Sequence, residues 1–184
     1  MEYQKCKFFY VGRIGYIKGI HLLLEAFAGL DASRCELHII GDTNEKYAQH
    51  LMKQYKKYPN IIFHGKIQPD EVSEYIRLFD ILVHPAIYLE VFGLNIGEAL
   101  LEKKPVIATR CGGAEMQIED KKNGLLIEPN NVDELQSAMQ WILDHPIEIR
   151  RMSDNADKHV ISMEEHVHTL VELYKNQIKK YNDF

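Results

Sequence analysis

The chain of 184 residues is long enough for one domain with a substantial core, since 46% of its residues are hydrophobic. Its formal net charge of −5 argues against a protein whose main work is to neutralise a nucleic-acid backbone. Cys6, Cys35 and Cys111 lie far apart and form no CxxC pair, so they predict neither a disulfide framework nor a zinc ribbon. They are typical of reduced thiols in a cytosolic protein. No apolar run approaches the ~18 residues of a membrane span.

Six short apolar runs predict buried strands of a parallel sheet. Each is nearly continuous in apolar residues, and several end in glycine or proline. The runs are Lys7–Gly12, Leu37–Gly41, Ile61–Gly65, Asp80–His84, Pro105–Thr109 and Gly124–Ile127.

Segments with helical spacing of apolar residues alternate with these runs. They cover about 20–30, a stretch that opens at Pro69, about 132–143, and about 163–182, where Ser162 and Glu165 form a capping box. This alternation predicts a doubly wound α/β domain, with a mostly parallel six-stranded sheet and helices on both faces. In such sheets, ligands bind outside the carboxyl ends of the strands.

The residues after the fourth run, Glu90-Val-Phe-Gly-Leu-Asn-Ile-Gly-Glu98, are the most informative stretch. The pattern places Glu90 in a strand-to-helix loop and Glu98 about one turn into the helix. The free amides of Gly93, Leu94 and Asn95 then form a helix N-terminus, which suits a phosphate. A carboxylate on each side could accept hydrogen bonds from sugar hydroxyls, as a nucleotide-sugar site requires. The pair alone is more typical of a solvated helix start, and a glycoside-hydrolase pair is a third option.

A second candidate phosphate-binding segment, Gly12-Arg-Ile-Gly-Tyr-Ile-Lys-Gly19, follows the first run. It is neither a Walker loop nor a GxGxxG fingerprint. Arg13 can present two donors to a phosphate and Lys18 a compact charge. Without further evidence, both are at least as well explained as solvated loop cations.

Weaker signals occur at three other strand ends. Gly112-Gly113 fits either backbone space for a ligand or a tight turn. His64-Gly65-Lys66 could meet a nucleobase edge or form a turn. His84 is either a ligand contact or a satisfied strand-end residue. No His, Cys and carboxylate set has metal-ligand spacing, and no GxSxG elbow is present.

Taken in order, these segments resemble the C-terminal, donor-binding domain of family 4 retaining glycosyltransferases, which have the GT-B fold. The resemblance covers nearly the whole chain. It is carried by Tyr10-Val-Gly-Arg13, Lys18-Gly19, Leu24-Glu-Ala-Phe27, Ile39-Ile-Gly41, Phe63-His-Gly65, His84-Pro85, the Glu90–Glu98 spacing, Pro105-Val-Ile-Ala108, Gly112-Gly113 and Asn123-Gly124.

The resemblance implies a domain that binds a nucleoside diphosphate sugar and transfers its hexosyl group to an acceptor hydroxyl. Glu90, Arg13 and Lys18 would be catalytic: Arg13 and Lys18 bind the diphosphate, and Glu90 binds the transferred sugar. Glu98 would bind the ribose, and backbone near Lys66 and Ile67 the base. The full implied donor site is Gly12, Arg13, Lys18, Gly65, Lys66, Ile67, Glu90, Phe92, Gly93, Leu94, Asn95 and Glu98. No metal or other cofactor is implied, because two cations and a helix terminus can balance the diphosphate.

Residues 1–184 would form one nucleotide-sugar-binding domain, without the N-terminal acceptor domain that completes such an enzyme. The isolated domain is therefore expected to bind donor without transferring sugar. The helix at about 163–182 would cross back to the missing half, so Tyr174, Ile178 and Tyr181 are expected to be partly exposed and to favour self-association. A cytoplasmic protein is expected, with peripheral membrane attachment left open for the full-length enzyme. The acceptor, the base and the sugar are not specified.

Two departures from the family pattern concern local structure. Lys103 stands where a glycine commonly ends the helix, which costs roughly 1 kcal/mol if the residue is left-handed. Pro85-Ala86 replaces a common Pro-Ser pair, so one hydroxyl is missing.

Two other functions remain as alternatives. A sugar-nucleotide epimerase half-domain would bind the same donor without an acceptor. A non-catalytic, receiver-like interaction domain would need an acidic cluster at a strand end, and Asp80 instead begins a strand.

Overall fold

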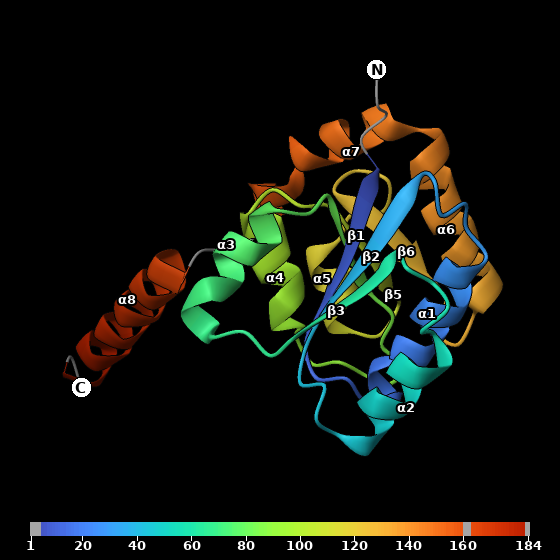
Figure 1. Ribbon diagram of the computed structural model, residues 1–184. Helices are drawn as coiled ribbons and strands as arrows, with labels where there is room; N and C mark the ends of the chain where they lie inside the picture. The colour runs from blue at the N-terminus through green and yellow to red at the C-terminus, as the bar shows by residue number, and fades with distance from the viewer. Residues whose placement is uncertain (1–4, 160–162, 183–184) are drawn as a thin grey trace.

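The computed structural model describes residues 5–159 and 163–182, and its centre is one parallel sheet (Figure 1). The strands lie in the order β3-β2-β1-β4-β5-β6. All five neighbouring pairs run parallel. The prediction of six strands is confirmed, with small shifts at their ends. The strands are β1 (Cys6–Val11), β2 (Cys35–Ile40), β3 (Ile61–Gly65), β4 (Ile81–His84), β5 (Val106–Thr109) and β6 (Gly124–Ile127).

Helices cover both faces of the sheet, as the alternating pattern predicts (Figure 1). On one face α1 (Ile20–Ala28), α2 (Lys46–Gln54) and α6 (Val132–Asp144) bury their apolar side chains against the strands. On the other face α3 (Val72–Arg77), α4 (Leu94–Leu101) and α5 (Gly113–Gln117) form a second core cluster. Short 3-10 turns, η1 (Tyr16–Lys18), η2 (Pro69–Glu71) and η3 (Ala156–His159), complete the connections.

Three helices were not predicted. Helix α2 has only two buried side chains, Ala48 and Leu51, so its apolar stripe is weak. Helix α5 is short and opens on glycine. Helix α7 (Pro146–Ser153) follows α6 directly and begins at a proline. Pro146 occupies a first-turn position of this helix, where its missing N–H costs nothing.

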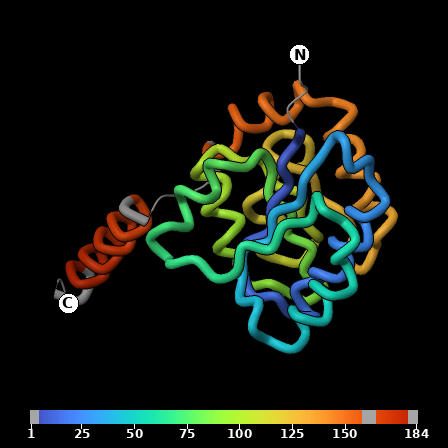
Figure 2. Tube along the Cα trace, in the orientation of Figure 1, coloured from blue at the N-terminus to red at the C-terminus, as the bar shows by residue number. Residues whose placement is uncertain are grey.

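The last helix, α8 (Met163–Asn182), stands apart from the body of the domain (Figure 2). Tyr174 and Ile178 are 67% and 60% exposed, as expected from their apolar stripe. The side chain of Tyr181 and the cap residue Ser162 lie outside the described residues. No helix in the described parts of the chain is long and apolar enough to cross a membrane.

The strand order places β1 beside β4 at the centre of the sheet. After β1 the chain enters α1 on one face, and after β4 it enters α4 on the other. This reversal is a topological switch point, where a crevice opens at the carboxyl ends of the strands. The two segments with the strongest sequence signals, Gly12–Gly19 and Glu90–Glu98, therefore meet at one place.

Helix α4 ends in a Schellman motif with Lys103 in a left-handed conformation, φ 57°. The amide of Lys104 donates to the carbonyl of Ala99 at 2.8 Å, and the amide of Lys103 to that of Leu100 at 3.0 Å. The predicted cost of a side chain at this position therefore applies.

Replacing Lys103 by glycine is expected to raise the free energy of unfolding by ~1 kcal/mol, because glycine has no Cβ to strain a left-handed backbone. Urea unfolding measures this change. Lys103→Ala is the matched control: it also removes the ion pair with Asp157 but keeps the Cβ, so it should give no gain. Equal stabilisation by both variants would contradict the backbone explanation.

Candidate functional site

A cleft of about 460 Å³ lies at the switch point. Its walls are the end of β1 with the following loop, the loop after β4, the first turn of α4, and one side chain from α3. It is lined by Tyr10, Val11, Gly12, Arg13, Lys18, Val72, His84, Glu90, Val91, Phe92, Gly93, Leu94, Asn95 and Glu98.

The loop after β1 forms a cationic wall. The amide of Gly12 continues the sheet by donating to the carbonyl of Ile40 at 3.0 Å. The buried hydroxyl of Tyr10 donates to the carbonyl of Arg13 at 2.6 Å, which fixes the loop from beneath. The Arg13 side chain is exposed and makes no hydrogen bond or ion pair with a described residue. Its donors are therefore available to an anion.

The first turn of α4 forms the opposite wall. Gly93 is the N-cap residue at φ 76°, a conformation that favours glycine. Within the described residues, no acceptor is bonded to the amides of Gly93, Leu94 or Asn95. The side-chain amide of Asn95 donates to the carbonyl of Val11 at 2.9 Å and ties this turn to β1. Unpaired helix N–H groups facing a cleft are a favourable place for a phosphate.

Lys18, Tyr88 and Glu90 form a closed hydrogen-bond network between the two walls. Lys18 Nζ lies 2.6 Å from Glu90 Oε2 and donates to the Tyr88 hydroxyl as well. The Tyr88 hydroxyl donates to the same carboxylate oxygen at 2.5 Å. Burial by itself raises the pKa of Glu90, but the hydrogen bonds from Lys18 and Tyr88 hold that pKa below its usual value. Glu90 is therefore a carboxylate at neutral pH.

Glu98 and His84 complete the polar lining. Glu98 lies one turn into α4, as predicted, and partial burial of its carboxyl raises its pKa. His84 is only 3% exposed, and neither ring nitrogen has a hydrogen-bond partner within the described chain. Burial lowers the pKa of His84 to about 4, so the ring is neutral although Glu90 Oε2 lies 3.9 Å away. His84 lines the cleft, and its contact with a ligand stays a prediction.

The loop after β5 supports Glu90 from outside the cleft. The Glu90 amide donates to the carbonyl of Cys111 at 2.9 Å, and the Gly113 amide donates to the carbonyl of Glu90 at 2.8 Å. A Cβ on Gly113 would lie 2.4 Å from the backbone of Phe92. The Gln117 side chain, 5% exposed, donates to the carbonyl of Phe92. The space at Gly112-Gly113 is therefore filled by the Glu90 loop and is not left open for a ligand.

The cleft thus brings together nine of the twelve predicted donor-site residues: Gly12, Arg13, Lys18, Glu90, Phe92, Gly93, Leu94, Asn95 and Glu98. Gly65, Lys66 and Ile67 do not line it. The carbonyl of Gly65 accepts from the amide of Gly41, Lys66 is exposed, and Ile67 packs against the second core cluster.

Sequence reasoning missed the supporting residues of the site. Tyr88 and Gln117 act through hydrogen bonds to the Glu90 loop, and Val72 reaches the cleft from α3. No spacing rule marks such contacts. The buried tyrosine at the end of β1 was visible only as part of the motif Tyr10–Arg13.

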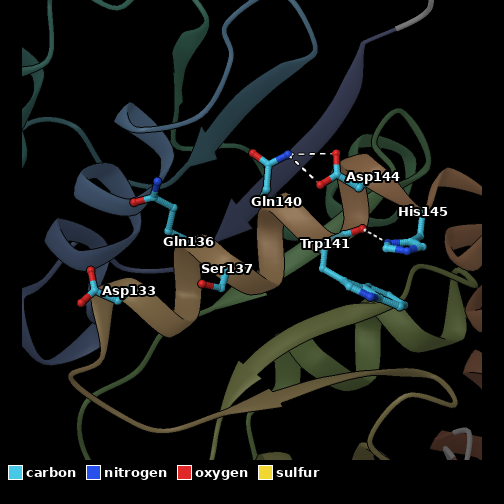
Figure 3. A pocket seen from close by; sticks show the side chains of 7 residues that line it. All are labelled: Asp133, Gln136, Ser137, Gln140, Trp141, Asp144 and His145. Carbon is cyan, nitrogen blue, oxygen red and sulfur yellow. Dashed lines mark hydrogen bonds between the residues drawn. The ribbon is translucent and has the colours of Figure 1, made fainter.

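A second hollow of similar volume, about 450 Å³, lies along α6 (Figure 3). It is lined by Asp133, Gln136, Ser137, Gln140, Trp141, Asp144 and His145. Gln140 donates to Asp144, and His145 contacts the carbonyl of Trp141, as Figure 3 shows. This lining has two carboxylates and no lysine or arginine, so it does not suit an anion.

No three or more His, Cys, Asp or Glu of the described ranges form a group that could hold a metal ion. The placement of Asp80 bears on the receiver-like alternative. Asp80 precedes β4 and accepts a hydrogen bond from the amide of Lys7 at 2.8 Å. Asp80 lies at the amino ends of the strands, opposite the cleft, so it does not provide the phosphoacceptor site that a receiver-like domain needs.

The comparisons with known proteins agree with this geometry. The family model "Glycosyl transferases group 1" matches residues 3–159. A GDP-mannose-dependent alpha-mannosyltransferase of Corynebacterium glutamicum is 36% identical over 138 residues, which cover 73% of this chain and 31% of the relative. D-rhamnosyltransferase WbpZ of Pseudomonas aeruginosa is 28% identical over 155 residues, covering 82% and 39%. The chain therefore spans well under half the length of these relatives.

Solved structures confirm the fold. A sucrose-phosphate synthase of Thermosynechococcus elongatus superposes with a TM-score of 0.87 at 25% identity, covering 98% of this chain and 47% of that one. Anabaena HepE, solved in complex with UDP, superposes with a TM-score of 0.82 at 23% identity, covering 93% and 49%. The predicted fold class, half of a GT-B enzyme, is confirmed.

Proposed function

This chain belongs to the family of group 1 glycosyl transferases, and we propose that its cleft binds the diphosphate and the sugar of a nucleotide-sugar donor. The proposal rests on two opposite walls: Arg13 and Lys18 lie on one, and three amides at the start of α4 lie on the other. Among the described residues, neither the Arg13 side chain nor these amides have a hydrogen-bond partner for their donors. A diphosphate bridging these walls would meet positive charge from both sides.

The residue roles follow from position in the cleft. Arg13, Lys18 and the first turn of α4 would hold the phosphates and stabilise the charge that develops on the leaving group. Glu90 would accept hydrogen bonds from hydroxyls of the transferred sugar, and Glu98 from the ribose. The base would lie toward Gly65, Lys66 and Ile67, at the neighbouring strand end. Since the cationic groups balance the diphosphate, we propose that the donor binds without a metal ion.

The reaction of the whole protein is a further part of the proposal. The chain would transfer a hexosyl group with retention of configuration to an acceptor hydroxyl held by an N-terminal domain, which the longer relatives have room for. The mannosyltransferase relative is named for GDP-mannose, and HepE has been solved with UDP-glucose. Both a guanine and a uracil donor are therefore worth testing here.

Binding of a nucleoside diphosphate tests the proposal directly. Calorimetry with UDP, GDP and ADP, in buffer containing EDTA, should show that at least one of them binds. Arg13→Ala should weaken that binding by ~1.5–3 kcal/mol, as expected for the loss of a charge-assisted hydrogen bond. The fold should survive, because Arg13 is an exposed loop residue.

Arg110→Ala is the matched control. Arg110 is also an exposed arginine, directly after β5 at the same edge of the sheet, but it pairs with Glu128 and does not line the cleft. Its removal should leave the affinity unchanged. Equal affinity of the Arg13→Ala variant and the parent chain would remove Arg13 from the phosphate site, and loss of all binding in EDTA would contradict the metal-free site.

A further inference from the structure

The unliganded cleft already contains a partner for its lysine. Lys18 Nζ donates to Glu90 Oε2 at 2.6 Å and to the Tyr88 hydroxyl, which in turn donates to the same Oε2. The Lys18 and Glu90 side chains are only 19% and 17% exposed, so solvent screens the pair weakly. In the unliganded cleft, Lys18 is therefore already ion-paired, whereas Arg13 has no ion pair with a described residue.

Glu90 has little freedom to leave this arrangement. Its backbone is hydrogen-bonded on both sides, to Cys111 and to Gly113. With Lys18 in place, burial keeps the nearby imidazole of His84 neutral, so Lys18 is the cation that balances Glu90. A ligand that draws Lys18 away consequently leaves the carboxylate with Tyr88 alone, in a half-buried cleft, where an uncompensated charge is costly.

The two ligands of the proposed reaction differ in how they meet this cost. A nucleoside diphosphate brings negative charge close to Glu90 and lacks the transferred sugar, whose hydroxyls could donate to the carboxylate. A nucleotide sugar brings the same phosphates together with hydroxyl donors that can satisfy the carboxylate. The Glu90–Lys18 pair therefore weakens the binding of a nucleoside diphosphate more than the binding of a nucleotide sugar.

We propose that Glu90 competes with the diphosphate for Lys18, and so selects the intact nucleotide-sugar donor over the nucleoside diphosphate left after transfer. The inference rests on the proposed function, because it assumes that Lys18 faces the phosphates. After transfer, the carboxylate loses its hydroxyl donors and takes Lys18 back, which favours release of the nucleoside diphosphate. Glu90 is then a specificity determinant as well as a sugar ligand.

The test is calorimetry of the 184-residue chain with UDP, GDP or ADP, using whichever binds best. Glu90→Gln keeps the side-chain shape and an acceptor oxygen but removes the charge. It should bind the nucleoside diphosphate about 5- to 10-fold tighter than the parent chain. The same variant should show no such gain with UDP-glucose, GDP-mannose or ADP-glucose, matched to that base, so the preference for the sugar-bearing ligand should fall.

Two further variants separate competition for Lys18 from a general charge effect. Glu98→Gln removes the other carboxylate of the cleft, which makes no ion pair with a described residue. Because this change also alters the proposed ribose contact, the variant should bind the nucleoside diphosphate no more tightly than the parent chain. In a Lys18→Met background, Glu90→Gln should lose most of its gain, because no lysine remains to be released. An undiminished gain in that background would overturn the inference.

The outcomes also distinguish this inference from the proposed function. Failure of the parent chain to bind any of the three nucleotides would overturn the proposed function, and the inference with it. Binding by the parent chain with equal or weaker binding by Glu90→Gln would overturn the inference alone.

Discussion

Replacing Gly19 by alanine is expected to lower the free energy of unfolding by ~3–5 kcal/mol. Gly19 has φ 69°, which strains any L side chain, and a Cβ there would lie 1.8 Å from the carbonyl oxygen of Pro85. That oxygen belongs to backbone at the end of β4, so it cannot rotate away. The backbone of Ile87 also donates to that of Ile17 at 3.0 Å, close to the same contact.

Urea unfolding of Gly19→Ala measures the effect, and Gly15→Ala is the control. Gly15 lies in the same loop, but its φ is −138°, and a Cβ at this position would have no neighbouring atom within 4 Å. It should change stability little. Because Gly19 seats the first loop against the end of β4, any folded Gly19→Ala protein should also bind nucleoside diphosphate less tightly. Similar stabilities for the two variants would show that the loops are not packed as described.

The second large effect is the acid sensitivity that His84 confers. Burial lowers the pKa of His84 to about 4, against about 6.5 in an unfolded chain; Glu90 works in the opposite direction and Lys18 in the same one. The unfolded state then binds the proton more readily than the folded state. The contribution of the neutral His84 ring to the free energy of unfolding is fully present above about pH 6.5. This contribution is lost as the pH falls through about 4.

Between about pH 7 and pH 4, this single group should lower the free energy of unfolding by ~3 kcal/mol. In His84→Leu that contribution disappears, so the stability of the variant should decline less steeply over the same range. His50→Leu changes an exposed histidine of α2 and should keep the slope of the parent chain. Parallel pH profiles for His84→Leu and the parent would contradict a buried, neutral His84.

The sheet could be predicted from the sequence because its strands are buried on both faces. Runs such as Ile81–Val83 are apolar throughout, and the intervening glycines and prolines mark their ends. Helices with a broad apolar stripe, such as α6, could be predicted for the same reason. Helices α2 and α5 bury too few side chains to leave a periodic signal.

The candidate site could be predicted only in part. Arg13, Glu90 and Glu98 were identified because each lies next to a strand end or in a helix start, and fold topology brings such positions together. The Lys18–Glu90 ion pair, which joins residues 72 positions apart, and the role of Tyr88 depend on side-chain geometry. The same holds for Gly113, whose close contact with Phe92 is invisible until the two loops are packed.

The binding of a nucleoside diphosphate between the two walls of the cleft is the central claim. Titration of the isotope-labelled chain with UDP, GDP and ADP, followed through backbone amide resonances, tests it most directly. At least one nucleotide should shift the amides of Gly93, Leu94 and Asn95 together with those of Gly12 and Arg13, and leave those of the α6 hollow unchanged. Shifts confined to α6, or no shift with any of the three nucleotides, would contradict the site proposed here.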